Sequence, residues 1–154
     1  MKEALALAEE AGADGEIPVG AVIVDRDGQI IGRGRNRRQS GDPLGHAELI
    51  AIRQAADAIG DWRLEGTTMV VTLEPCAMCA GALVNARVEK LIFGADDPKA
   101  GFCGTLGNLV QDARLNHRLE VVRGVEAESS KRLLQGFFQG LRKRLNDTER
   151  WQSG

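Results

Sequence analysis

Two short segments of the chain carry residue types that could bind a metal ion. One contains His46, and the other contains Cys76 and Cys79 directly after Pro75. Cysteines three residues apart at the start of a helix lie about one turn apart on the same face, so their sulfurs can share one tetrahedral ion. The positive end of the helix dipole also favours their thiolate forms. We therefore predict a zinc site whose ligands are His46, Cys76 and Cys79.

The number of ligands indicates a catalytic rather than a structural site. Structural zinc sites usually have four protein ligands, whereas catalytic sites keep one position for water, whose pKa the metal lowers toward neutrality. The two segments supply three ligands. The other candidates, Cys103 and His117, lie in unrelated contexts, and we expect them to be a small buried residue and a structural hydrogen-bonding residue. Glu48, two residues after His46, is predicted to pass protons between the attacking water, a substrate ring nitrogen and the leaving ammonia.

Other interpretations of these residues remain open at this point. A Cys-x-x-Cys pair is also typical of redox-active dithiols and of one half of a structural zinc knuckle. A redox pair would not need an upstream His-x-Glu, and a knuckle would need a second cysteine pair. A non-enzymatic, zinc-stabilised interaction domain is the remaining alternative, and Glu48 argues against it because a structural site does not require that carboxylate.

The composition is that of one ordinary globular domain. The 154 residues are 43% hydrophobic, with a net charge of −2. A nucleic-acid surface would therefore have to be local. No apolar run is long enough to span a bilayer, and the N-terminal run with interleaved acidic residues resembles neither a signal nor a transit peptide. We expect a cytoplasmic protein without membrane contact.

Hydrophobic periodicity and turn residues predict an α/β domain over residues 1–145, with a disordered tail over 146–154. A strand, a short helix and a strand within 67–94 indicate a crossover between parallel neighbours. The expected sheet is mixed and five-stranded, with helices on both faces. Helices are predicted at 2–12, 46–59, 76–86 and 126–145, and strands at 17–25, 29–34, 67–73, 88–94 and 119–123.

The two segments together match the signature H-x-E…P-C-x-x-C of zinc-dependent base deaminases. Over about residues 4–145 the chain resembles the bacterial tRNA-specific adenosine deaminases (TadA type) of the cytidine/deoxycytidylate deaminase superfamily. Many free-base deaminases share the zinc motif alone, so the other matching segments are more specific. They lie at 16–22, around Asn36, and at 42–43, 72–81, 93–101, 116–117 and 137–138.

The resemblance implies a cytidine-deaminase-like three-layer α/β/α fold, one Zn²⁺ per chain and a homodimer. It implies hydrolysis at a C–N bond of a cyclic amidine, which converts the wobble adenosine of a tRNA anticodon stem-loop to inosine. The alternative is a free-base or nucleoside deaminase, acting on guanine or cytosine, on the same scaffold. The matching positions give His46, Cys76 and Cys79 as ligands and Glu48 as the proton shuttle.

Further matches imply residues that contact the substrate. Asn36 corresponds to an asparagine that contacts the target nucleotide, and Asp97 to an acidic residue that contacts the anticodon-loop backbone. Arginines surround Asn36, and we expect them in one loop: Arg33, Arg35, Arg37 and Arg38. Of these, Arg37 and Arg38 are predicted phosphate contacts, with a solvated loop as the alternative.

Three further positions bear on the predicted substrate surface. Phe137 and Phe138 are adjacent on a helix and cannot face the same core. We expect one of them in the core, and Phe138 is the predicted substrate contact. Gly45 stands where the family commonly has alanine, which is expected to loosen the loop before His46.

Overall fold

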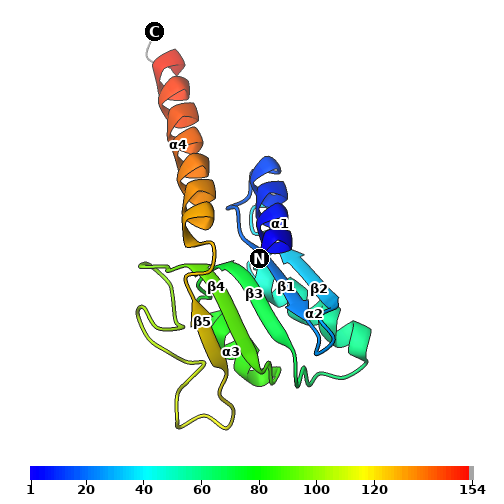
Figure 1. Ribbon diagram of the computed structural model, residues 1–154. Coiled ribbons are helices and arrows are strands. Elements are labelled where there is room, and N and C mark those ends of the chain that lie inside the picture. The colour runs from blue at the N-terminus through cyan, green and yellow to red at the C-terminus, as the bar shows by residue number, and fades with distance from the viewer. Residues whose placement is uncertain (153–154) are drawn as a thin grey trace.

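The computed structural model describes residues 1–152, with side chains described for residues 1–147. Five strands form one sheet in the order β2-β1-β3-β4-β5 (Figure 1). β1 is antiparallel to β2 and β3, whereas β3, β4 and β5 run parallel to one another. The mixed five-stranded sheet is therefore confirmed. The strands are β1 (Gly20–Val24), β2 (Ile30–Arg35), β3 (Thr68–Leu73), β4 (Lys90–Ala95) and β5 (Glu120–Arg123).

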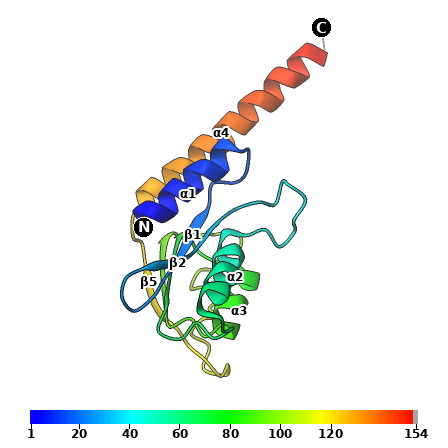
Figure 2. The same cartoon turned by 90° about the vertical axis from the view of Figure 1, so that its right-hand side faces the viewer.

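Helices cover both faces of the sheet, which confirms the three-layer α/β/α architecture. Figure 2 shows α1 and α4 together on one side and α2 and α3 on the other. The crossover from β3 through α3 to the parallel β4 is the one that the sequence predicts. The helices are α1 (Lys2–Ala13), α2 (Ala47–Ile59), α3 (Ala77–Asn85) and α4 (Ala127–Gln152).

Small residues let α2 lie against the sheet at short range. Gly34 of β2 faces the first turn of α2, and a Cβ atom at this position would overlap the main-chain oxygen of Ala47. Ala47 and Ala51 are fully buried at this contact. The close approach fixes where α2 begins, and therefore where His46 lies.

The core lies between the three inner strands, β1, β3 and β4, and the layer formed by α2 and α3. Ile23, Met69, Val71, Leu91 and Phe93 are fully buried in it. Burial of side chains of this size typically contributes about 1.5–3 kcal/mol each, so these strands form a rigid base for the loops at their ends.

The C-terminal helix is longer than the sequence analysis predicts. α4 continues past Leu145 to Gln152, because the sequence has neither glycine nor proline between Leu145 and Gly154. The expected tail is thus helical as far as Gln152, and residues 153–154 lie outside the described residues. Within residues 1–152, no helix combines the length and the apolar character needed to cross a membrane.

Candidate active site

The three predicted metal ligands lie together where two helices begin. His46 directly precedes α2, Cys76 directly precedes α3, and Cys79 lies in the first turn of α3. Their ligand atoms all lie within 4.8 Å of one another. The Nδ1 atom of His46 is 3.6 Å from the sulfur of Cys76 and 3.5 Å from that of Cys79. The nitrogen and sulfur ligands of a tetrahedral zinc ion are about 3.5 Å apart, so the two distances from His46 fit a shared Zn²⁺.

The other two candidate ligands lie outside this group. Cys103 is buried, and its sulfur lies 3.9 Å from the main-chain oxygen of Pro75. The Nε2 atom of His117 donates to the main-chain oxygen of Val88 over 2.7 Å. Both positions agree with the structural roles expected for them. Among the side chains of residues 1–147, His46, Cys76 and Cys79 are therefore the group that could hold a metal ion.

The two cysteines differ in their acidity. A hydrogen bond from the thiol of Cys79 lowers the pKa of Cys76 to about 5. The pKa of Cys79, which donates that bond and is buried, is raised. A cation held between the two sulfurs would stabilise both as thiolates.

Glu48 lies in the first turn of α2, and its side chain faces the ligand group without belonging to it. It is only 4% exposed. Burial raises the pKa of this carboxyl to about 7. A group that titrates near neutral pH can both accept and donate a proton there, which is the property that general acid–base catalysis requires.

A cavity of about 140 Å³ opens onto Glu48, His46 and Cys76. Apolar side chains form part of its wall, and polar groups from loops after β2 and β4 form another part. Asn36, Asp97 and Arg38, which the sequence predicts as substrate contacts, are among the residues that line it. The full lining is Ile17, Val19, Asn36, Arg38, His46, Glu48, Leu73, Glu74, Cys76, Asp97 and Ala100.

Asn36 follows β2 and is buried. Its Oδ1 atom accepts a hydrogen bond from the main-chain nitrogen of Ala47 over 3.2 Å. Among the described residues, its Nδ2 atom has no hydrogen-bond partner. The side chain is thus fixed by its oxygen, which leaves an amide donor for a ligand in the cavity.

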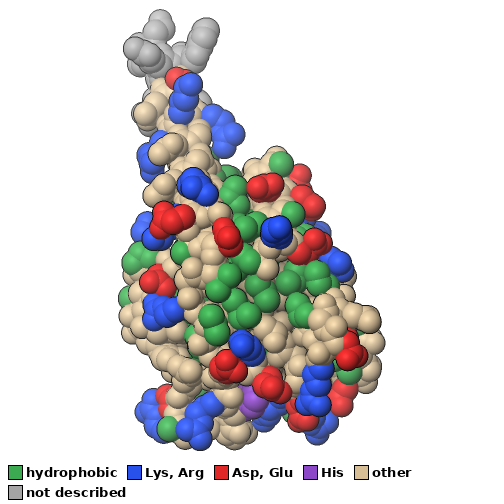
Figure 3. Space-filling model, viewed as in Figure 1, with side chains coloured by type: hydrophobic (Ala, Val, Ile, Leu, Met, Phe, Trp, Pro, Cys, Tyr) green, Lys and Arg blue, Asp and Glu red, His purple; other side chains and the backbone are tan. Residues whose placement is uncertain are grey.

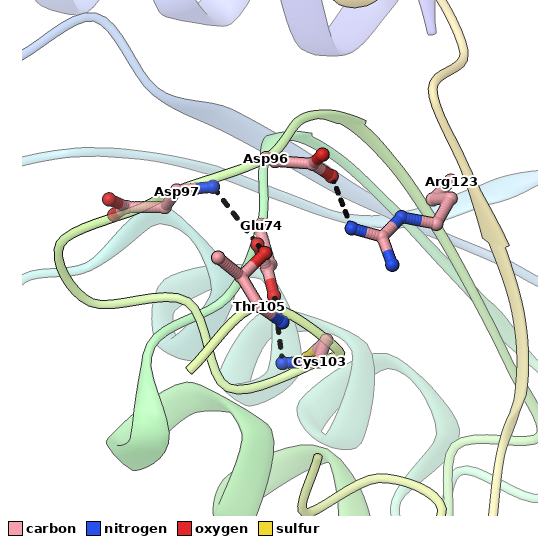
Figure 4. A network of polar contacts seen from close by, with 6 residues as sticks. All are labelled: Glu74, Asp96, Asp97, Cys103, Thr105 and Arg123. Atoms are coloured by element: carbon pink, nitrogen blue, oxygen red, sulfur yellow. Dashed lines mark hydrogen bonds and ion pairs between the residues drawn. The ribbon is translucent and has the colours of Figure 1, made fainter. Parts of the chain in front are cut away.

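Asp97 lies in the loop after β4, and this loop is organised around the buried Glu74 (Figure 4). The main-chain nitrogen of Asp97 donates to the Oε2 atom of Glu74 over 2.9 Å. The main-chain nitrogens of Cys103 and Thr105 donate to Oε1 over 3.1 and 3.0 Å. Glu74 was not among the residues predicted for the site. Its position could have indicated such a role, because it lies directly between an apolar strand and the start of a helix. A charged residue there is buried and needs hydrogen-bond donors around it.

A second buried carboxylate, also not singled out from the sequence, holds the loop on the other side of the cavity. The oxygens of Glu16 accept hydrogen bonds from the main-chain nitrogens of Gln39 and Ser40 over 3.1 and 3.2 Å.

The expected loosening at Gly45 is not seen in the contacts of this residue. Its main-chain nitrogen donates to the main-chain oxygen of Asp42, and its main-chain oxygen accepts from the main-chain nitrogen of Arg37. This loop is therefore closed by main-chain hydrogen bonds.

The expectation of four arginines in one loop is wrong for two of them. Arg33 and Arg35 belong to β2, where alternate residues share a face. That face meets α1, and Arg33 pairs with Glu3 over 3.1 Å, whereas Arg35 pairs with acidic side chains at the end of α1. Of the other two, Arg38 lines the cavity, whereas Arg37 faces separate surface hollows.

The phenylalanine pair lies away from the cavity. Phe137 and Phe138 contact each other edge to face, with ring centroids 5.5 Å apart. Neither is in the core, contrary to the expectation for one of them: Phe138 is 40% exposed, and Phe137 lines a groove between α1 and α4. Apolar side chains gather on this part of the surface in Figure 3. The reason is that α4 covers the sheet only with its first turns, before these residues.

Comparison with known proteins agrees with this geometry. The model of the MafB19-like deaminase family matches residues 1–142. The tRNA-specific adenosine deaminase of Bacillus subtilis is 52% identical over 145 residues, which span 94% of this chain and 89% of that protein. The protein of the same name from Haemophilus influenzae is 49% identical over 140 residues, or 90% of this chain and 81% of that protein.

Solved structures agree as well. A structure from work on A-to-I editing by tRNA:A34 deaminases at the wobble position of transfer RNA superposes with a TM-score of 0.83. It is 41% identical and covers 87% of this chain and 97% of its own. The guanine deaminase from Nitrosomonas europaea has a TM-score of 0.77 at 23% identity, with 88% and 81% covered. This second likeness shows a shared fold alone.

The three-layer fold, with His46, Cys76 and Cys79 grouped beside a buried Glu48, is that of a deaminase enzyme. The chain belongs to the family of the tRNA-specific adenosine deaminases. The resemblance found in the sequence is thereby confirmed.

Proposed function

We propose that this protein converts the wobble adenosine of a tRNA anticodon stem-loop to inosine, with one zinc ion per chain. The observation that carries the proposal is the group of His46, Cys76 and Cys79 next to the buried carboxyl of Glu48, at a cavity with polar groups on its rim. The identity to tRNA-specific adenosine deaminases supports the choice of substrate.

Zinc held by the three ligands would supply a water activated for attack on carbon 6 of the adenine ring. Glu48 takes one proton from this water and delivers it to ring nitrogen N1. It then delivers the second proton to the exocyclic nitrogen. The bond from carbon 6 to that nitrogen breaks, so adenosine and water yield inosine and ammonia. The near-neutral pKa of Glu48 suits both directions of transfer.

The cavity suits a single purine base. Ile17, Val19 and Leu73 supply apolar wall for the faces of the ring. The free Nδ2 donor of Asn36 is suited to a ring nitrogen, because adenine offers only acceptors at its ring nitrogens. A base within a folded RNA cannot reach the cavity, so the target nucleotide must be unpaired and turned outward.

The rim suits the nucleotides beside the target. Asp97 carries a negative charge, so it would accept a hydrogen bond from a ribose hydroxyl rather than contact a phosphate. Arg38, which is exposed at the cavity, would attract a phosphate. Arg37 and Phe138 lie outside the cavity, so their proposed contacts would be to RNA farther from the target base.

The alternative is a deaminase of free guanine or cytosine. The cavity of about 140 Å³ fits a free base as well as the base of a nucleotide that is turned outward. Incubation with an anticodon stem-loop that carries wobble adenosine, beside free guanine, cytosine and adenosine, tests the two. We expect inosine in the stem-loop and little product from free bases. Efficient turnover of guanine or cytosine, with an untouched stem-loop, would replace the proposal by this alternative.

We also propose that the enzyme is a homodimer and that it acts in the cytoplasm, where tRNA is modified. The support for both is the family resemblance. Sedimentation at micromolar concentration tests the dimer, and a monomer alone at that concentration would contradict it.

A further inference from the structure

We propose that Glu74 is a positioning residue that sets substrate affinity by holding the loop of residues 96–105 in the shape that presents Asp97 to the RNA. This inference rests on the proposed function, because it takes Asp97 as a contact to the substrate.

Glu74 is buried, with 2% exposure, and both of its oxygens are used by this loop. Oε2 accepts from the main-chain nitrogen of Asp97 and from the hydroxyl of Thr105. Oε1 accepts from the main-chain nitrogens of Cys103 and Thr105. Every partner is a donor, so the site matches a carboxylate and no other side chain of this size.

The loop wraps closely around this carboxylate. A Cβ atom at Gly101 would overlap the Oε2 atom of Glu74. The main chain is also fixed next to the metal ligands, since the nitrogen of Phe102 donates to the oxygen of Pro75 over 2.9 Å. Hydrogen bonds to Glu74 therefore hold the loop together with its own main-chain hydrogen bonds and the burial of Cys103.

Two neighbouring aspartates are given different tasks by this arrangement (Figure 4). Asp96 turns away from the cavity and pairs with Arg123 of β5 over 2.7 Å. Asp97 lines the cavity. Its Oδ1 atom accepts from the main-chain nitrogens of Lys99 and Ala100, over 2.9 and 3.2 Å. Its Oδ2 atom has no hydrogen bond among the described residues and is left for a ligand.

The hydrogen bond from the nitrogen of Asp97 to Glu74 is thus the contact that orients the residue at the cavity. Glu74 also lies two residues before Cys76, so a role through the metal site has to be distinguished. Loss of a metal ligand's support would lower zinc content and kcat. Loss of support for Asp97 would instead raise KM for the RNA while zinc stays bound.

Glu74→Gln tests this role with a change of one atom. The amide is the same size, but its NH₂ group meets donors where the carboxylate accepts. We expect one zinc per chain, a KM for the stem-loop raised about tenfold, and a smaller change in kcat. We also expect faster hydrogen exchange at the amides of Asp97, Cys103 and Thr105, because these are the groups that Glu74 protects.

A double-mutant cycle shows whether Glu74 acts through Asp97. Once Asp97→Ala has removed the contact, Glu74→Gln should raise KM little further. Glu16→Gln is the matched control, since this buried carboxylate holds the opposite loop through Gln39 and Ser40. The factor by which Glu16→Gln raises KM should be the same with and without Asp97→Ala.

Equal effects of Glu74→Gln in the presence and absence of Asp97 would overturn the inference, and so would unchanged exchange at the three amides. The exchange experiment uses no RNA, so it still tests the loop if the unaltered protein forms no inosine, a result that would instead reject the proposed function. If Glu74→Gln loses zinc, Thr105→Val removes only one hydroxyl donor to Glu74. Thr105→Val should also raise KM and speed amide exchange in the loop, by smaller factors than Glu74→Gln. If neither KM nor the exchange changes in this variant, the inference is overturned.

Discussion

The side chain of Asn36 joins the end of β2 to the first turn of α2, because its Oδ1 atom accepts a hydrogen bond from the nitrogen of Ala47. The same amide group lines the cavity. One residue therefore contacts the start of the helix that carries Glu48 and presents a donor to the cavity.

Asn36→Asp separates these two tasks. The aspartate oxygen still accepts from Ala47, but the Nδ2 donor is lost and a negative charge faces the acceptors of the ring. We expect kcat/KM for the stem-loop to fall at least about tenfold, with zinc retained. Asn36→Ala should also lower the melting temperature, because it removes the link to α2. Full activity of Asn36→Asp would exclude the donor contact to the base.

The ligand set is tested by metal content. Cys79→Ala should abolish stoichiometric zinc and turnover, because two protein ligands hold the ion far less tightly. Cys103→Ser should leave zinc content unchanged, since its sulfur lies outside the ligand group. Elemental analysis of the purified proteins gives both values. If Cys103→Ser lost zinc, Cys103 would be a fourth ligand and the site would be structural.

Glu48→Gln should keep the fold and the metal but lose nearly all turnover. The amide cannot accept the proton of the attacking water, and general acid–base catalysis typically contributes about 10²–10⁴-fold. Single-turnover inosine formation measures the loss, and zinc content is its control. Near-normal turnover with bound zinc would remove Glu48 from the mechanism.

Arg38→Ala should raise KM for the stem-loop more than Arg37→Ala does, because only Arg38 lines the cavity. The difference between Arg38→Ala and the unaltered protein should shrink as salt rises, since screening weakens phosphate attraction. Kinetics at two salt concentrations give the comparison. If Arg37→Ala raised KM more than Arg38→Ala does, the RNA phosphates would lie on the side of the loop that carries Arg37.

Gly34→Ala should destabilise the protein by about 1–3 kcal/mol, because the added methyl overlaps the oxygen of Ala47 and pushes α2 from the sheet. Thermal unfolding should show a melting temperature lower by about 2–4 °C for each kcal/mol. Gly140→Ala is the control: it lies in α4 with open space around its position, so it should leave stability unchanged or raised. Equal melting temperatures for Gly34→Ala and the unaltered protein would refute the close contact.

Each half of the candidate metal group could be predicted from the sequence, because the spacing within each half is local, whereas the meeting of the two halves depends on the fold. Cys76 and Cys79 are one helical turn apart whatever the rest of the chain does, and His46 and Glu48 lie together at another helix start. The strands were predictable for a similar reason, since runs of β-branched and apolar residues, and the glycine with a positive φ between β1 and β2, are short-range patterns. Helix α2 ends at Ile59 as predicted, and Gly60 follows it in the left-handed conformation that glycine adopts at little cost.

Only the tertiary structure decided which charged residues serve the site. Arg33 and Arg38 are alike in the sequence, but the pleat of β2 turns Arg33 toward Glu3 while the following loop brings Arg38 to the cavity. Glu74 is a single acidic residue in the sequence, and its partners lie 23 to 31 residues away. A buried carboxylate is stable only where folding brings donors to it, and no local pattern states which distant main-chain nitrogens those will be.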